Sequence, residues 1–339
     1  YVTLGESEAA VEAVAEAQEQ LCASLGLTGR VRVAREGING TLGGLRADVA
    51  AYVARMQADG RFGEVDWKTS DAAERPFPAL LVRRVKEIVA LELPDAECDL
   101  SLGGTHLSPA QFRAEQLNTS PDRVALIDVR NTYEYSIGHF AGALNPKTRR
   151  FGQFPDWVRA ELPALQSKDK ILMYCTGGIR CEKASAFLGH LGLTNVYQLS
   201  GGIHRYLEAF PDGGGVFHGK NFVFDERVAM ASEDLTVTGS CEACGIPHDV
   251  VSGARCAYCR IHVLLCDPCR ETTAVDDVFC EEHGALVAGS LDDVKETAAG
   301  LSARLDALVG RGNKGKRRSL RKQLDTVERR IQRLTPSNP

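Results

Sequence analysis

The chain has few aromatic residues and no long apolar run. Phe, Trp and Tyr make up 6% of its 339 residues. No stretch of ~18 consecutive apolar residues occurs, which excludes a membrane-spanning helix of ordinary length. The content of 44% hydrophobic and 25% charged residues is typical of a soluble protein and predicts two or three globular units.

Targeting and cofactor motifs are also missing. The first residues include neither an initiator Met nor the apolar core of a signal peptide. We therefore expect a cytoplasmic protein with a trimmed amino terminus; the alternative is an organelle protein, in the stroma or matrix, that has lost a transit peptide. The sequence contains no flavin or nicotinamide motif and no recognisable non-haem iron triad.

One loop has the composition of a cradle for a nucleophile. The residues Cys175-Thr-Gly-Gly-Ile-Arg-Cys181 follow the apolar run Lys170–Tyr174 and precede the helix-like stretch Glu182–Leu188. A strand, a short loop and a helix amino terminus direct several backbone N–H groups and the helix dipole at one point. A thiolate at that point is stabilised, so Cys175 is predicted to be a catalytic nucleophile. The predicted anion and substrate cradle comprises Thr176, Gly177, Gly178, Ile179 and Arg180.

Supporting residues are expected on a neighbouring strand end. Asp128 and Arg130 follow an apolar run, and we expect them to brace the loop rather than to react. Glu134 and His139 are expected to hold the entry segment through hydrogen bonds. Spacing alone gives no support for a general base among these residues.

Residues 1–95 are predicted to form a ferredoxin-like (acylphosphatase-like) α+β domain. Their strand and helix patterns follow the order β-α-β-β-α-β, which is the order of that fold. The segment Glu36-Gly-Ile-Asn-Gly-Thr41 is either a hairpin turn, which Asn-Gly favours, or a substrate contact. The expected strands are Tyr1–Leu4, Arg30–Arg35, Thr41–Gly43, Val65–Thr69 and Leu80–Leu93, and the expected helices are Glu8–Leu25 and Leu45–Gln57.

Residues 105–230 are predicted to form an α/β domain with a parallel sheet. The apolar strands Val124–Val129, Lys170–Cys175 and Asn195–Leu199 alternate with helix patterns. Such alternation means that helices cover both faces of the sheet. Cys175 then lies at the carboxyl end of a central strand, where open α/β sheets bind their ligands.

Seven of the eleven cysteines lie between Cys241 and Cys280, as metal ligands do, rather than in a disulfide pattern. Four pairs with two-residue gaps supply eight ligands, which predicts two structural zinc ions in a module at 238–285. Either the first pair joins the third and the second the fourth, or the pairs join sequentially. His248 and His262 are competing ligands. The predicted ligands are Cys241, Cys244, Cys256, Cys259, Cys266, Cys269, Cys280 and His283.

Residues 290–335 are predicted to form a basic helical hairpin. Apolar residues recur at heptad spacing on both sides of the glycine-containing stretch 310–315. The whole chain has a net charge of −5, yet from Arg311 onward it contains ten basic and two acidic residues. Such a density suits an RNA backbone; the alternative is a solvated pair of helices that forms a homo-oligomer. The predicted RNA-binding residues are Lys316, Arg317, Arg318, Arg321 and Lys322.

Several separated segments resemble a known family. Ala125–Glu134 with Gly138–Asn145 is similar to the rhodanese pattern, and Asn195–Ile203 resembles the last core strand and turn of that family. A narrower resemblance, to the rhodanese-domain tRNA wobble-uridine hydroxylases, covers residues 1–285 and leaves the basic hairpin as an addition. The segments that carry it are Glu36–Thr41, Thr176–Lys183 and Phe222–Arg227.

The resemblance implies a fold and an activity. It implies a ferredoxin-like domain followed by a rhodanese domain, and an oxygen-dependent conversion of the wobble uridine of tRNA to 5-hydroxyuridine in which Cys175 is essential. The anticodon arm would then be docked by the basic tail, the metal module and the amino-terminal domain. Cys175 either attacks the pyrimidine ring or carries an oxidised sulfur such as a sulfenic acid.

Two other functions compete with the hydroxylase hypothesis. In a sulfurtransferase, Cys175 would take a sulfane sulfur from a donor such as thiosulfate, hold it as a persulfide and pass it to a thiol. Cys181 would then either resolve the persulfide or merely pack in the first helical turn. The third hypothesis is a non-enzymatic scaffold, which the intact Cys175 and Arg180 disfavour.

Overall fold

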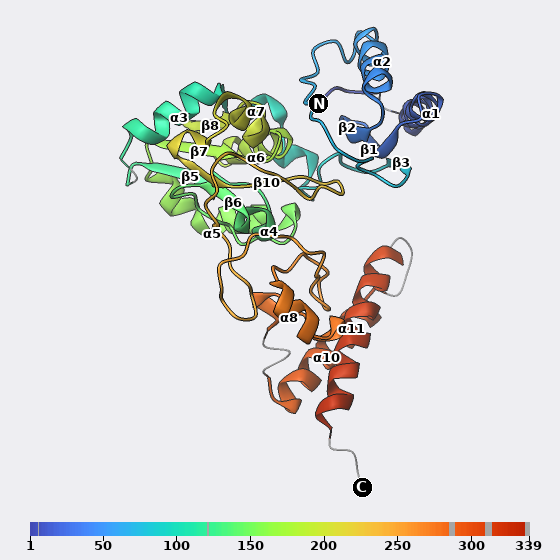
Figure 1. Cartoon of the computed structure of the whole chain (residues 1–339), viewed down its shortest axis with the longest axis vertical. Helices are drawn as coiled ribbons and strands as arrows, with labels where there is room; N and C mark the ends of the chain where they lie inside the picture. Colours follow the sequence, from blue (N-terminus) through green and yellow to red (C-terminus); the bar gives the residue numbers. More distant parts are fainter. Residues whose placement is uncertain (6, 121, 285–288, 309–313, 336–339) are drawn as a thin grey trace. The chain divides into compact units, whose positions relative to one another are not determined.

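The computed structural model describes residues 1–5, 7–120, 122–284, 289–308 and 314–335 (Figure 1). The chain divides into two compact units, Tyr1–Thr236 and Val237–Pro339. The end of the expected metal module at residue 285 and most of the glycine-containing stretch 310–315 lie outside the described residues. No helix in the described ranges combines the length and the hydropathy that crossing a membrane requires.

The first part of the chain forms a three-stranded sheet with helices on one face. The strand order is β2-β1-β3, with β1 antiparallel to β2 and parallel to β3. Val31 and Val33 of β1 are buried against Val11 and Val14 of the first helix and Met56 of the second. The elements are α1 Glu8–Ser24, β1 Thr28–Ala34, β2 Gly37–Gly43, α2 Arg46–Gln57 and β3 Leu80–Arg84.

Two expected strands of this domain are absent, and one is shorter than expected. Val2 and Leu4 donate backbone hydrogen bonds to the turn at residues 35–36, beyond the end of the strand ladder, so 1–4 is not a strand. The segment 65–69 is not a strand because it contacts Arg205 instead of a sheet edge. The third strand ends at Arg84, where its partner β1 also ends.

The hairpin turn lies at Arg35-Glu36 and not at the Asn-Gly pair. Ala34 pairs with Gly37, and Asn39 pairs with Arg32 inside the ladder, so Asn39-Gly40 is part of a strand. Gly37 has a φ of 137°, a conformation that side chains with a Cβ rarely adopt. Gly37 therefore lets the chain reverse at Arg35-Glu36. The Asn-Gly pair, which favours a turn in general, led to the wrong position for it.

The second part of the first unit contains a four-stranded parallel sheet of order β4-β8-β7-β5. Two small antiparallel sheets, β6-β9 and β10-β11, flank it. The helices are α3 Pro109–Asn118, α4 Thr132–Ser136, α5 Phe154–Gln166, α6 Ile179–His190 and α7 Gly202–Ala209. The strands are β4 Thr105–Leu107, β5 Val124–Asp128, β6 Gly138–Phe140, β7 Lys170–Tyr174, β8 Val196–Leu199, β9 Phe217–Gly219, β10 Asn221–Phe222 and β11 Ala229–Met230.

The central strand β7 is buried on both faces, as the apolar run predicts. Ile171 and Met173 belong to one hydrophobic cluster with helices α5 and α6, whereas Leu172 and Tyr174 belong to another with α3 and α7. Side chains alternate between the two faces of a strand, so each face receives its own layer of helices. The expected α/β sheet is confirmed, and its central strand leads directly to Cys175.

The second unit contains the Cys-rich segment and two long helices. A short helix, α8 Asp267–Thr272, lies within the Cys-rich segment. Helices α10 Leu291–Asp306 and α11 Lys314–Leu334 pack together through the heptad residues, including Val294, Leu301, Leu320 and Val327. The apolar heptad residues of the expected hairpin therefore pack α10 against α11 within one chain. Oligomerisation through the hairpin stays a prediction.

Candidate active site and metal centres

The Cys175 loop connects β7 to α6 at the carboxyl edge of the parallel sheet (Figure 1). Gly178 caps the helix with a φ of 95°, and its backbone N–H donates to Cys175 Sγ over 3.1 Å. The Cys175 side chain is fully buried. The left-handed glycine turns loop amides toward the Cys175 sulfur. Binding of an anion or substrate by this loop stays a prediction.

The surroundings of Cys175 favour its thiolate. Burial opposes ionisation of the thiol. A hydrogen bond with Cys181, the positive charge of Arg180 and backbone amides of the loop outweigh burial and lower the pKa of Cys175 to about 5. The same burial and hydrogen bond raise the pKa of Cys181 well above its usual value. Cys175 is therefore a thiolate at neutral pH, and Cys181 remains a thiol that can donate to it.

Arg180 is fixed by a buried carboxylate. Two of its guanidinium nitrogens donate to the two carboxylate oxygens of Glu134 at 2.7 and 2.8 Å, and one also donates to the Thr176 hydroxyl at 3.1 Å. Thr176 in turn donates to Glu134 at 3.2 Å. Burial opposes ionisation of Glu134, but the charge of Arg180 holds the pKa of Glu134 below its usual value. Glu134 thus supports the cradle more directly than the expected entry-segment role suggests.

Asp128 and Arg130 form a second buried pair that braces the entry segment. The Arg130 guanidinium donates to both oxygens of Asp128, at 2.7 Å in the shortest contact, and to the Gly138 carbonyl at 2.6 Å. Both side chains are fully buried. His139 contacts the Tyr135 carbonyl at 2.9 Å. This geometry supports a positioning role for these residues.

A second glycine loop packs against the first. The backbone N–H groups of Ile203 and His204 donate to the carbonyls of Cys175 and Thr176 at 3.0 and 3.1 Å. A Cβ at Gly202 would lie 2.5 Å from the Cys175 carbonyl oxygen. Only glycine fits this close approach, so the turn after β8 holds the cradle in place.

The amino-terminal domain contacts the cradle, which sequence reasoning did not predict. The Tyr1 hydroxyl donates to the Ile179 carbonyl at 3.1 Å. Lys183 of α6, with 5% of its side chain exposed, pairs with Glu36 and Glu87, both at 2.8 Å. Glu36 therefore makes an ion pair with α6, the helix that follows the Cys175 loop, a role outside the two alternatives considered for its segment. Glu36 and Lys183 both lie in segments that carry the family resemblance, and this was the only hint in the sequence that they act together.

An aromatic group lies beside Arg180. The Phe224 ring is 47% exposed, and the Arg180 guanidinium lies 5.8 Å from its centre. Phe222 packs edge-on against Phe224, with ring centres 5.2 Å apart, and against Tyr133 at 5.0 Å. A half-exposed ring at the edge of an anion cradle offers a stacking surface for a planar ligand.

The eight predicted metal ligands form two groups in the second unit. In each group the ligand atoms lie within 4.8 Å of one another, and His248 and His262 belong to neither. Cys244 Sγ and Cys266 Sγ are 3.7 Å apart, and Cys259 Sγ and Cys280 Sγ are 3.8 Å apart. The interleaved pairing is the one observed. One group is Cys241, Cys244, Cys266 and Cys269, and the other is Cys256, Cys259, Cys280 and His283.

The predicted RNA-binding residues lie on α11. Lys316, Arg318, Arg321 and Lys322 are exposed, whereas Arg317 is half-buried. Further along the helix, Arg333 forms a 2.5 Å ion pair with Asp277 of the Cys-rich segment. The first turns of α11 therefore carry a cluster of exposed positive charge, and Arg333 in the last turn pairs with the Cys-rich segment.

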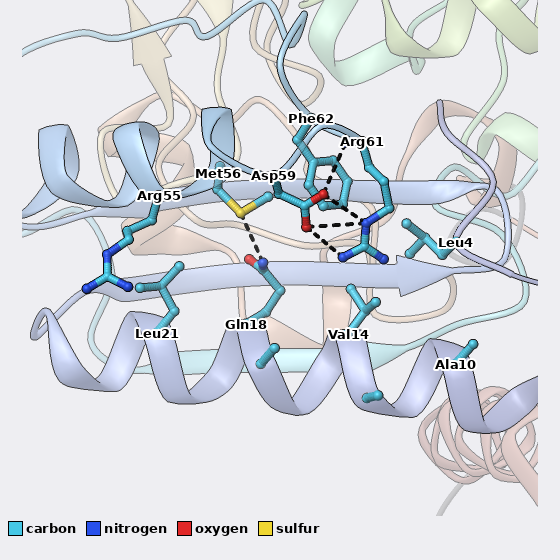
Figure 2. Close-up of a pocket in the computed structure, with 12 residues that line it drawn as sticks. Leu4, Ala10, Val14, Gln18, Leu21, Arg55, Met56, Asp59, Arg61 and Phe62 are labelled. Carbon is cyan, nitrogen blue, oxygen red and sulfur yellow. Dashed lines mark hydrogen bonds and ion pairs between the residues drawn. The ribbon is translucent and has the colours of Figure 1, made fainter.

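A cavity of about 570 Å³ lies elsewhere, between α1 and the segment that follows α2 (Figure 2). Gln18 donates to Met56 Sδ at 3.1 Å across it, and Asp59 pairs with Arg61 at 2.6 Å. Asp59 and Arg61 neutralise each other, and the described residues that line the cavity include no Cys or His nucleophile. The cavity therefore has none of the chemistry of the Cys175 loop.

Three family models match successive parts of the chain. The model described as a UPF0176 acylphosphatase-like domain matches residues 1–88. A rhodanese-like domain model matches 108–209, and a rhodanese carboxyl-terminal model matches 218–283. The Cys175 loop and its glycine partner fall in the second match.

Curated relatives match across these domains. Proteins named tRNA uridine(34) hydroxylase from Brucella canis and Brucella suis biovar 1 are each 40% identical over 257 residues. The matches cover 73% of this chain and 83% and 82% of the two relatives. A Saccharomyces cerevisiae structure, described as a homologue of single-domain rhodanese and the Cdc25 phosphatase catalytic domain, aligns with 35% of this chain and 89% of its own, at 21% identity and a TM-score of 0.29. At this identity and coverage of the curated relatives, the chain belongs to the tRNA uridine(34) hydroxylase family.

Proposed function

We propose that this protein hydroxylates the uridine at position 34 of tRNA and that Cys175 is its nucleophile. The observation that carries the proposal is the buried Cys175 sulfur, which accepts a hydrogen bond from the Gly178 amide over 3.1 Å, in a chain whose curated relatives are named for this reaction. An activated thiolate next to a stacking surface suits covalent chemistry on a pyrimidine ring.

The proposed reaction replaces the C5–H bond of uracil with C5–OH. The Cys175 thiolate adds to C6, and the ring electrons move to C5, which becomes nucleophilic. Molecular oxygen supplies one atom to C5 and the other leaves as water, with two electrons from a thiol reductant that becomes a disulfide. Loss of the C5 proton and departure of the thiolate then restore the ring.

The residues of the cradle prepare the thiolate and hold the ring. The Gly178 amide and the Cys181 thiol donate to sulfur, which stabilises it both before attack and as the leaving group. Arg180, fixed by Glu134, places its charge beside the site where an anion develops. We assign Phe224 as the surface on which the uracil ring stacks, because it is exposed and lies over Arg180.

We propose that the two Cys-rich groups each hold a structural zinc ion. A tetrahedral zinc with Zn–S bonds of about 2.3 Å has sulfur atoms about 3.8 Å apart, and the observed separations are 3.7 and 3.8 Å. A donor set of four Cys, or of three Cys and one His, fills every tetrahedral position. The ions would therefore stabilise the fold of the second unit and have no open position for catalysis.

We propose that the exposed basic turns of α11 bind the backbone of the anticodon arm. Lys316, Arg318, Arg321 and Lys322 are exposed within seven residues. Clustered Lys and Arg side chains bind phosphates by releasing counterions, and such binding weakens steeply with salt. This contribution is independent of sequence, so it supports affinity and leaves the choice of base to the Cys175 site.

The test is nucleoside mass spectrometry of a uridine-34 tRNA transcript incubated aerobically with the full-length protein and a thiol. We expect one additional oxygen on uridine, and no product with Cys175→Ser. Cys98→Ser is the matched control, since Cys98 is also a free cysteine but donates only to a backbone carbonyl. Unchanged tRNA together with thiocyanate formation from thiosulfate and cyanide would replace the proposal with the sulfurtransferase.

A further inference from the structure

Helices α1 and α2 cover one face of the three-stranded sheet in the amino-terminal domain and leave the other face open. In β1, the exposed residues Arg30 and Arg32 alternate with the buried residues Val31 and Val33. The buried residues face helices α1 and α2 in the domain core. Because side chains alternate across a strand, both arginines lie on the face that the helices leave open.

The strand register extends this face over all three strands. Arg30 lies opposite Thr41 of β2 and Leu81 of β3, and Arg32 lies opposite Asn39 and Arg83. Arg83 and Leu81 are exposed. The sequences of the three strands contain no Asp or Glu. The strand residues on this face therefore include three exposed arginines and the exposed Thr41, and none of them is acidic.

The charges of these arginines are not used for internal pairing. Within the ranges that the structure describes, Arg30, Arg32 and Arg83 have no ion pair or side-chain hydrogen bond with another residue. Arg84, the next residue of β3, is a useful contrast because it lies on the opposite face and pairs with Glu12 of α1 at 2.7 Å. Three unpaired guanidinium groups on one face have no evident role in stabilising the domain.

We propose that this face binds the phosphate backbone of the RNA substrate; the proposal rests on the proposed function. Residues two apart on a strand are separated by roughly 6.6 Å, and neighbouring strands by roughly 4.8 Å. Arg30, Arg32 and Arg83 thus form a compact triangle of positive charge that matches a polyanion. Guanidinium groups bind phosphate oxygens in bidentate fashion, and the exposed Thr41 supplies a weaker polar contact. The Asn39 side chain already donates to the Ile88 carbonyl at 3.3 Å.

The position of the sheet links this face to the catalytic helix. Glu36 lies in the turn of the β1–β2 hairpin, and its carboxylate pairs with Lys183 of α6 at 2.8 Å. The same helix begins at the cradle of Cys175. Arg32 precedes Glu36 by only four residues, so the proposal has one RNA molecule contact this face and the Cys175 loop together.

The experiment measures binding of a fluorescent uridine-34 tRNA transcript to the full-length protein by anisotropy over a range of salt concentrations. The variants are Arg30→Gln, Arg32→Gln, Arg83→Gln and the triple combination. We expect each single substitution to raise Kd several-fold at about 0.1 M salt and to reduce the salt slope by about one. The triple variant should raise Kd by about tenfold or more.

Arg55→Gln is the matched control, because Arg55 is also exposed but lies on α2, on the covered side of the sheet. It should leave Kd and the salt slope unchanged. If the three sheet variants bind tRNA as tightly as Arg55→Gln does, the proposal is wrong.

Mass spectrometry at saturating tRNA separates the two proposals. Loss of affinity in the sheet variants with no hydroxylation by the wild type would overturn the proposed function alone. Hydroxylation by the wild type with normal binding by the sheet variants would overturn the sheet proposal alone.

Discussion

At the residue scale, Cys181 has a chemical role that spacing alone left open. It is fully buried, as a packing residue would be, yet it also shares a hydrogen bond with Cys175. Because the pKa of Cys181 is raised, it keeps its proton over the pH range in which Cys175 is ionised. A protonated thiol next to a thiolate stabilises the negative charge, so Cys181 supports the nucleophile as a donor.

Replacement of Cys181 by Ala should raise the pKa of Cys175. The thiolate form loses a donor while the thiol form loses little, so ionisation moves to higher pH. The pH profile of Cys175 alkylation by iodoacetamide, which starts from a midpoint of about 5, should shift upward. The rate near pH 6 should then fall and the rate above pH 9 should not. Cys181→Ser, which keeps a donor, should shift the profile less; equal profiles for wild type and Cys181→Ala would show that Cys181 only packs.

Phe224 is the second residue whose role can be tested alone. Loss of a base–aromatic stack costs about 1–3 kcal/mol, so Phe224→Ala should lower kcat/KM for tRNA hydroxylation by roughly 5- to 150-fold. Phe224→Trp should restore most of the activity. Leu235→Ala is the control, since Leu235 is 89% exposed and outside the cradle. An unaffected Phe224→Ala enzyme would remove the stacking role and leave the thiolate chemistry intact.

At the element scale, the catalytic helix α6 is attached to the amino-terminal domain by one buried ammonium. Lys183 pairs with both Glu36 and Glu87, and its side chain is 5% exposed. Removal of one partner from a buried ion pair leaves uncompensated charge, at a cost of about 3–5 kcal/mol. Here Lys183→Met would leave two carboxylates facing each other without a cation.

Lys183→Met should therefore lower the free energy of unfolding of the first unit by about 3 kcal/mol, measured by urea denaturation. Lys170→Met is the matched control, because Lys170 is also ion-paired, but with one carboxylate only, that of Glu115, and with 34% of its side chain exposed. Its effect should be much smaller, since exposed pairs stabilise little. Equal midpoints for the two variants would contradict the structural role of Lys183.

The elements that the sequence predicts correctly are those with local causes. The run Lys170–Tyr174 is apolar on both faces, and the glycines after Cys175 permit the turn into α6. The expected strand at 65–69 fails because its backbone contacts Arg205, a residue far away in sequence. The Asn39-Gly40 signal fails because register with Arg32 places both residues inside a ladder. Tertiary contacts override local propensity at these positions.

The same distinction applies to the active site. Cys175 and its cradle follow from one continuous segment, and so does their chemistry. The ion pairs of Glu134 with Arg180 and of Glu36 with Lys183 join residues 46 and 147 positions apart. Spacing along a chain carries no information about such pairs. The structure is needed to show that the amino-terminal domain contacts the catalytic helix.

At the scale of the whole molecule, chemistry and metal binding belong to different compact units. Cys175 lies in Tyr1–Thr236, whereas both metal groups lie in Val237–Pro339. The interleaved ligands connect four short segments of the second unit, which has a small hydrophobic core of its own. We therefore expect metal loss to unfold the second unit and to leave the Cys175 thiolate in place.

Two double variants test both the ligand pairing and this independence. Cys244→Ser with Cys269→Ser removes two ligands from one group, so native mass spectrometry should find one zinc per chain. Cys244→Ser with Cys259→Ser damages both groups and should leave none. Sequential pairing would give the opposite result, because Cys244 and Cys259 would then share a site.

In both variants the pH profile of Cys175 alkylation should match the wild type, whereas proteolysis within 237–339 should be fast only when both ions are lost. A shifted alkylation profile would show that the metal sites act on the catalytic unit.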